Sequence, residues 1–208
     1  MDDHTKILSL FSVEVSTEQV RFDKDELEYI KNDIYAFDTE SFRSDTDYKE
    51  SVITSYHSNI KLQDQPEFAM LANTLTNKAT SYAEKFLNFD TENFSINLDR
   101  MWYQIYKKGM YHAMHNHSYT LVSGAYYIQA PKNCADFIIR HPIHYGLRDY
   151  PRNEKINSVK NIRESVPIKP KTDMLILFPG WLDHQTSIHM SDEDRVMISC
   201  NWHFGFRK

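Results

Sequence analysis

Lys108-Gly-Met-Tyr-His-Ala-Met-His-Asn-His-Ser118 contains three of the ten histidines of this chain within six residues. His115 and His117 stand two positions apart. In an extended strand, residues two apart point to the same side, so a strand edge here would aim both imidazoles at one point. Neutral imidazole is a common ligand of iron, zinc, copper and nickel. This segment therefore predicts part of a metal site.

A pair of histidines needs a third ligand from elsewhere in the chain. The best candidate is His184, which closes the segment Leu175-Ile-Leu-Phe-Pro-Gly-Trp-Leu-Asp-His184. A lone H-x-H pair is a weak signal, because most histidines are surface or hydrogen-bonded residues that bind no metal. The distal histidine strengthens the metal interpretation, and so does the arginine that follows it.

Arg195 begins a strand-like run near the end of the sequence. If the odd-numbered side chains of this strand face the metal, Arg195, Ser199 and Asn201 all point inward. A guanidinium can hold a carboxylate through two parallel hydrogen bonds, so this polar row is suited to bind a dicarboxylate. The competing interpretation is a surface ion pair of Arg195 with Asp192 or Glu193.

Length and composition exclude several classes of protein. The 208 residues fit one domain, spanning 1–208. The net charge of −5 comes without a basic stripe, so nucleic-acid binding is not indicated. The sequence contains no run of 18 apolar residues, so no membrane span is expected. The polar, acidic start lacks the features of a signal peptide. The two cysteines form neither a CxxC pair nor a disulfide framework, which favours a cytoplasmic protein.

The N-terminal part, residues 1–92, is predicted to be helical and rich in loops. It begins with a β-rich run at Ile7–Val15, which predicts a first strand. Asp23 and Glu26 have the spacing of a capping box. Apolar residues at helical spacing follow, so a helix is expected over Asp25–Ala36.

Residues 38–65 are polar throughout and predict a long loop, in which Ser51–Ser58 is a candidate short strand. A loop of this length within a compact domain often covers a functional site, although a plain surface connection explains it equally well. Pro66 opens a second helix, whose apolar face continues to about residue 87.

From residue 93 to 208 the pattern is that of β-structure. A second polar loop is expected at 141–165. The expected strands begin at Asn93 and continue with Leu121–Ala130, Asp136–Arg140, Val166–Ile168, Asp173–Phe178 and Arg195 to about Gly205. Two helices followed by seven or eight short strands predict a mainly β protein with flanking helices, either a β-sandwich or a jelly-roll barrel.

Five segments give the chain, from about Leu8 to Phe204, a resemblance to a known family. They are Trp102–Gly109, His115–His117, Leu121–Tyr127, Leu177–His184 and Arg195–Asn201, and the short Ser55-Tyr-His-Ser-Asn59 resembles a further motif. The chain resembles the 2-oxoglutarate and iron(II)-dependent oxygenases, and within them a bacterial and phage group with an H-x-H motif. Ser123–Tyr127 and Phe178–His184 are the more specific parts of this resemblance.

The resemblance implies a double-stranded β-helix, which is a cupin-like jelly roll. It also implies iron(II) at His115 and His184, and the 5-carboxylate of 2-oxoglutarate at Arg195, with Tyr127 supporting the cosubstrate. The larger family usually has H-x-D where this chain has His117. We expect His117 to bind the metal, which would add one unit of positive charge to the site. The alternative is that water or a remote carboxylate completes the coordination.

The implied activity is a dioxygenase that consumes O2, decarboxylates 2-oxoglutarate to succinate and CO2, and hydroxylates an unidentified substrate. Trp102, Tyr106 and Trp181 are candidates to line the substrate pocket, although core packing is the more common role of such residues. A cupin-like metal- or small-molecule-binding barrel without oxygenase activity is the alternative. The sequence leaves the oligomeric state and the substrate open.

Overall fold

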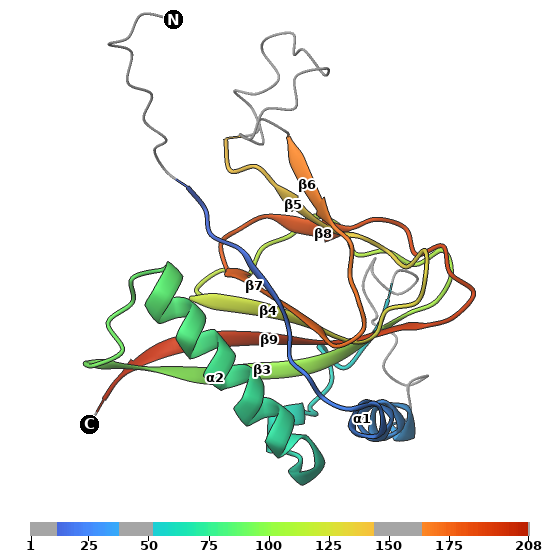
Figure 1. The fold of residues 1–208 in the computed structure, drawn as a ribbon, viewed down its shortest axis with the longest axis horizontal. Coiled ribbons are helices and arrows are strands. Elements are labelled where there is room, and N and C mark those ends of the chain that lie inside the picture. The colour runs from blue at the N-terminus through green and yellow to red at the C-terminus, as the bar shows by residue number, and fades with distance from the viewer. Residues whose placement is uncertain (1–11, 38–51, 144–163, 208) are drawn as a thin grey trace, which may run out of the picture.

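The computed structural model describes residues 12–37, 52–143 and 164–207. Its strands form two antiparallel sheets (Figure 1). The larger sheet has the strand order β1-β7-β4-β9-β3-β2 and the smaller one β6-β5-β8. The strands are β1 Ser16–Gln19, β2 Ile53–Thr54, β3 Phe94–Tyr106, β4 Val122–Gln129, β5 Phe137–Arg140, β6 Ser165–Ile168, β7 Met174–Pro179, β8 His184–Thr186 and β9 Arg195–Phe206. The predicted class, a mainly β jelly roll with flanking helices, is confirmed.

Both predicted helices are present. Helix α1 spans Lys24–Ala36, and its first turn is closed by the expected capping box: the Asp23 carboxylate accepts from the Glu26 N–H at 2.8 Å, and the Glu26 carboxylate accepts from the Asp23 N–H at 2.8 Å. Helix α2 spans Ala69–Phe86 and follows two 3-10 turns, η1 at Leu62–Asp64 and η2 at Pro66–Phe68. Neither α-helix of the described chain has the length and apolar character that a bilayer span requires.

The first strand differs from the prediction. Residues 7–11 lie outside the described part of the chain, and Val13 to Val15 form no strand. Pairing begins at Ser16, where β1 runs antiparallel to β7 at the edge of the larger sheet. An edge strand is stabilised by its backbone hydrogen bonds to one neighbour, so its side chains need not alternate between apolar and polar. The polar sequence of β1 shows no such alternation and therefore did not predict a strand. The short, polar β8 escaped prediction for the same reason.

The hydrophobic core has two parts, one on each face of the larger sheet. Helices α1 and α2 cover the outer face (Figure 1), where the even-numbered Ile198 and Trp202 of β9 are fully buried. The inner face meets the smaller sheet through Met197, Phe178 and Phe137. Burial of side chains of this size contributes about 1.5–3 kcal/mol each. The predicted inward orientation of the odd-numbered residues of β9 is thereby confirmed, and the candidate site lies between the sheets.

Candidate metal centre

Three imidazoles meet between the sheets. One nitrogen from each of His115, His117 and His184 lies within 4.8 Å of the others. The ring centroids of His115 and His117 are 4.2 and 5.0 Å from that of His184. His115 and His117 belong to the segment between β3 and β4, whereas His184 opens β8. The sequence therefore identified a group of histidines that the fold brings together from segments almost seventy residues apart.

Backbone hydrogen bonds fix this arrangement. His115 and His184 form an isolated antiparallel bridge, in which each N–H donates to the carbonyl of the other at 3.0 and 2.9 Å. The His117 N–H donates to the Gly180 carbonyl at 2.8 Å. A Cβ at Gly180 would lie 2.4 Å from the carbonyl oxygen of Thr120, so only glycine permits this close approach. The turn at Pro179-Gly180 is thus part of the support for the second histidine.

The hydrogen bonds of the rings determine which nitrogen is available to a metal. Nδ1 of His115 lies 2.8 Å from the Ala113 carbonyl, and Nδ1 of His184 lies 2.9 Å from the Leu182 carbonyl. A carbonyl can only accept, so both Nδ1 atoms carry the proton and both Nε2 atoms keep a free lone pair. Metal-binding histidines characteristically donate their second N–H in this way.

The ring of His117 is held by side chains, whereas the rings of His115 and His184 are held by backbone carbonyls. Its Nδ1 lies 2.7 Å from both the Ser123 hydroxyl and the Asn201 Oδ1, and Ser123 donates to the same Oδ1 at 3.1 Å. These contacts place the proton on Nδ1 here as well. Asn201, which we expected among the cosubstrate ligands, therefore lies behind His117. Ser123 was not predicted for the site, although it belongs to the Leu121–Tyr127 segment that carried the family resemblance.

Burial keeps these imidazoles neutral. It lowers the pKa of His117 to about 4, and repulsion by His115 adds to the shift. The pKa of His115 is lowered and that of His184 is lowered further, again mainly by burial. Neutral imidazole is the form that binds a metal. Three neutral rings with bare Nε2 atoms fit a transition-metal ion, and among the described residues no carboxylate joins this group.

The neighbouring polar groups do not complete the donor set. Asp183 precedes His184, but its carboxylate accepts from the Asn116 amide at 2.9 Å at the surface. The His112 ring centroid is 4.1 Å from that of His115, yet His112 lies outside the group of three. Burial lowers the pKa of His112 to about 3, so it too is neutral near pH 7.

Arg195 is fully buried, with 0% of its surface exposed. Its Nη1 donates to the Ala135 carbonyl at 2.9 Å, while its buried Nε has no hydrogen-bond partner among the described residues. The guanidinium lies 3.6 Å from the ring centroid of Tyr106 and 5.6 Å from that of Tyr127. The Tyr127 hydroxyl is also buried, without a partner in the part of the chain that the structure describes. A buried cation next to an unsatisfied donor is costly unless an anion binds there.

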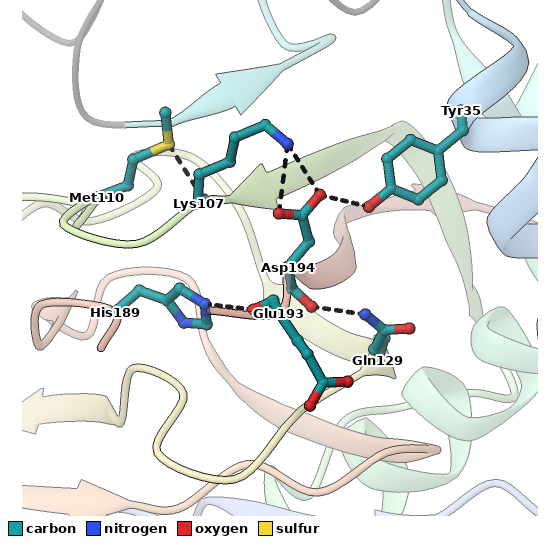
Figure 2. A network of polar contacts seen from close by, with 7 residues as sticks. All are labelled: Tyr35, Lys107, Met110, Gln129, His189, Glu193 and Asp194. Carbon is teal, nitrogen blue, oxygen red and sulfur yellow. Dashed lines mark hydrogen bonds and ion pairs between the residues drawn. The ribbon is translucent and has the colours of Figure 1, made fainter. Parts of the chain in front are cut away.

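The alternative ion pair of Arg195 is not present in the part of the chain that the structure describes. Asp192 accepts from Lys108 at 2.7 Å. Figure 2 shows the Asp194 carboxylate between Lys107, at 3.0 Å, and the Tyr35 hydroxyl of α1, at 2.7 Å. Lysines therefore neutralise Asp192 and Asp194 just before β9, and no ion pair joins Arg195 to Asp192, to Glu193 or to another carboxylate among the described residues.

His189 and Gln129 hold the backbone in the same place. The His189 Nε2 donates to the Glu193 carbonyl at 2.9 Å, and the Gln129 amide donates to the Asp194 carbonyl at 2.7 Å (Figure 2). Together these contacts fix the chain immediately before Arg195. They therefore fix the direction in which the Arg195 side chain, at the start of β9, points into the protein.

Two cavities adjoin the histidines. The inner one, of about 30 Å³, is lined by Tyr106, Met197 and Ser199 among others. The outer one, of about 180 Å³, is lined by Trp102 and by residues of the segment 52–57. Since a water molecule needs about 10–15 Å³ of such space, the inner cavity has room for only two or three water molecules. A dicarboxylate can enter it only if side chains such as that of Tyr106 move.

The other predicted residues separate into two groups. Trp102 lines both cavities, Tyr106 lines the inner one, and Ser199 donates to Gln104 at 3.4 Å beside them. Trp181 is 54% exposed and lines neither cavity. Gln104 was missed, although the strand alternation that places Trp102 and Tyr106 inward applies to it equally.

Residues 100–201 match the family model described as "Putative 2OG-Fe(II) oxygenase". No curated protein sequence matches the chain.

Solved structures share the fold. HygX from Streptomyces hygroscopicus, with nickel, 2-oxoglutarate and hygromycin B bound, is 13% identical, with a TM-score of 0.63 over 92% of this chain and 83% of HygX. The viral collagen prolyl hydroxylase of Paramecium bursaria Chlorella virus-1, in complex with 2-oxoglutarate, is 11% identical, with a TM-score of 0.57 over 93% and 96% of the two chains. A prolyl-4-hydroxylase of Pseudomonas putida is 9% identical, with a TM-score of 0.59 over 92% and 93%.

At these identities the structural likeness shows the fold, while the sequence match covers the region that contains all three histidines and Arg195. The family match over residues 100–201, about half of the chain, supports a relation to the 2-oxoglutarate and iron(II)-dependent oxygenases, and the chain shares the double-stranded β-helix fold of the solved structures.

Proposed function

We propose that this protein is a dioxygenase that uses iron(II) and 2-oxoglutarate to hydroxylate a substrate, with release of succinate and CO2. The observation that supports this most directly is the state of Arg195. A fully buried guanidinium with an unpartnered Nε, no acidic partner among the described residues and a three-histidine group nearby suits a carboxylate ligand.

His115, His117 and His184 would hold the iron through their Nε2 atoms, which their Nδ1 hydrogen bonds leave free. The bound metal would supply the oxygen-activating redox chemistry of the family. Asn201 and Ser123 orient His117, which is the usual role of the outer partners of a metal ligand. The protein contributes position, neutral ligands and a cavity with little water.

Arg195 would bind the far carboxylate of 2-oxoglutarate. The Tyr127 hydroxyl, which is buried and unpartnered, can donate to the same group. Tyr106 lies on the guanidinium at 3.6 Å and lines the inner cavity, so it is the side chain that has to move on binding. Rotamer changes of this kind are common when ligands bind.

The all-histidine donor set favours a second candidate, a metal-binding barrel without oxygenase activity. Iron oxygenases of this type typically use two histidines and one carboxylate. Three neutral ligands leave the site one unit more positive, and they suit zinc or copper as well as iron. In such a barrel Arg195 would have no cosubstrate to bind.

One experiment separates these functions. The protein is incubated without oxygen with iron(II), and 2-oxoglutarate is titrated by calorimetry. Oxygen is then admitted and succinate is measured. We expect binding of 2-oxoglutarate that requires the metal, followed by slow succinate formation without added substrate. Metal binding without any binding of millimolar 2-oxoglutarate would leave the metal-binding barrel as the function.

A further inference from the structure

The turn at Ser55–Asn59 is a rigid platform beside the metal centre. It follows β2 and is fixed to β3, because the Ser55 N–H donates to the Tyr103 carbonyl at 3.3 Å and the Tyr103 N–H donates to the Ser55 hydroxyl oxygen at 3.1 Å. The Ser58 N–H closes the turn on the Ser55 carbonyl at 3.1 Å. So many internal bonds hold this short polar segment in a single conformation.

Two aromatic side chains project from this turn. Arg100 donates to the carbonyls of Tyr56 and Ser58, and its guanidinium lies 4.5 Å from the centroid of the Tyr56 ring. The Tyr56 ring meets Trp102 at 4.9 Å and His57 at 5.1 Å, with interplanar angles of 63° and 89°. Tyr56 nevertheless remains 38% exposed. A fixed yet accessible aromatic ring is what a binding surface requires.

These rings form one wall of the outer cavity. Its volume of about 180 Å³ corresponds to roughly 12 to 18 water-sized positions, which is enough for one sugar ring with its hydroxyl groups. The lining residues are Val52, Thr54, Tyr56, His57, Trp102, Gln104, His112, His115, Asn116 and His117. Two of them, His115 and His117, belong to the group of three histidines, so a molecule in this cavity would lie next to a metal bound there.

Among the described residues that line the cavity, none carries a carboxylate, ammonium or guanidinium group. Its polar groups include the amides of Gln104 and Asn116. The Gln104 Oε1 accepts from Tyr106 and Ser199 at 3.5 and 3.4 Å. This leaves its amide N–H groups without a partner in the described ranges 12–37, 52–143 and 164–207. Neither an anion nor a cation would find a compensating charge on this wall.

We propose that the substrate of this site is an uncharged, polyhydroxylated ring, such as a hexose unit, that packs on Tyr56 and Trp102 and hydrogen-bonds with Gln104. This inference rests on the proposed function. A flat base requires parallel aromatic faces, whereas these rings are steeply tilted. An apolar ring would leave the amide of Gln104 unsatisfied. A sugar ring offers both a C–H face for the aromatic wall and hydroxyl groups for the amides.

The test is saturation-transfer NMR with protein that holds zinc(II) and 2-oxoglutarate. The probes are the neutral methyl glucoside, galactoside and mannoside, the anionic methyl glucuronide, the cationic methyl glycoside of glucosamine, and N-acetylprolinamide. We expect transfer to at least one neutral hexoside and weaker transfer to both charged analogues and to the proline derivative. The signal of 2-oxoglutarate in the same sample reports the proposed function separately.

Substitutions at Tyr56 test whether saturation transfer to the hexoside depends on the turn at Ser55–Asn59. Tyr56→Ala is expected to weaken hexoside binding roughly tenfold, as the loss of an aromatic contact does, whereas Tyr56→Phe retains it. Tyr29→Ala removes a tyrosine that is 72% exposed on α1 and serves as the matched control. Binding of 2-oxoglutarate without transfer to any neutral hexoside overturns the inference. Equal transfer to the charged analogues, or transfer that survives Tyr56→Ala, overturns it as well.

Discussion

The site has a histidine end, formed by His115, His117 and His184, and an arginine end, formed by Arg195. The two ends differ in how the hydrogen-bonding groups of their side chains are satisfied. Each histidine of the group of three has a hydrogen bond to Nδ1, and only Nε2 is left for a metal. Arg195 is more deeply buried, yet its Nε has no partner among the described residues. The proposed metal ligands are therefore fixed in advance, whereas under the proposed function the arginine end becomes satisfied only when an anion binds. A site built in this way should bind its metal first and its cosubstrate second.

Removal of a metal ligand should have the largest effect. His184→Ala deletes the buried ring that faces both other histidines, and we expect the loss of stoichiometric metal binding, beyond the 10–100-fold typical of outer partners. The fold should survive, because the backbone bridge of residue 184 to His115 does not need the side chain. Elemental analysis of the purified variant measures this. His203→Ala, outside the group, is the control, and full occupancy in the His184 variant would reject the assignment.

The arginine end is tested by Arg195→Ala. A desolvated carboxylate that loses its partner costs about 2–5 kcal/mol, which is roughly a 30-fold to several thousandfold loss of 2-oxoglutarate affinity. Arg195→Lys should recover only part of it, because an ammonium lacks the planar fork. Calorimetry with the metal-loaded proteins gives both values, and metal binding should be unchanged. If the alanine variant binds 2-oxoglutarate as the wild type does, Arg195 is not the anchor.

A smaller effect on metal affinity is expected when Asn201, a hydrogen-bond partner of the His117 ring, is substituted. Asn201→Leu removes the oxygen that accepts from the His117 Nδ1 while it keeps the volume of the side chain. Loss of such an outer partner reduces metal affinity about 10–100-fold. A competition titration with a chromogenic chelator measures the change. Wild-type affinity in this variant would mean that Ser123 alone orients the ring.

Acid should destabilise the histidine end in the metal-free protein. The pKa of His117 is lowered to about 4 and that of His112 to about 3 in the folded state, against about 6.5 in the unfolded chain. Below pH 6.5 the unfolded state therefore binds more protons, and stability falls as the pH falls, by up to about 1.4 kcal/mol per pH unit for each such histidine. Urea unfolding at pH 7, 6 and 5 tests this. A midpoint that does not move would contradict it.

The sequence predicted more of the site than of the edges of the fold. The histidines could be found because a metal needs particular side chains at particular spacings, and the inward face of β9 because alternation in a strand is strict. Asn201 was assigned to the correct face, but no pattern in the sequence could show that His117 lies close enough to bond with it. The exposed position of Trp181 likewise depends on the course of a turn. The sequence could not show that Arg195 is buried without an acidic partner among the described residues. That follows from the three-dimensional arrangement of Lys107, Lys108 and the acidic residues that they neutralise.

The smallest effect is expected for His117→Asp, which converts the donor set to two histidines and one carboxylate. A carboxylate adds a negative charge near the metal, which favours a divalent ion, but it is shorter than an imidazole and has to reach from the same backbone position. These two effects oppose each other, so metal affinity should stay within about tenfold of the wild type. Isothermal titration with iron(II) under nitrogen measures it, with His117→Ala as the matched variant that lacks a ligand. If the aspartate variant loses the metal while its circular dichroism is unchanged, the site requires three nitrogen ligands. The all-histidine set would then be a property that this protein needs.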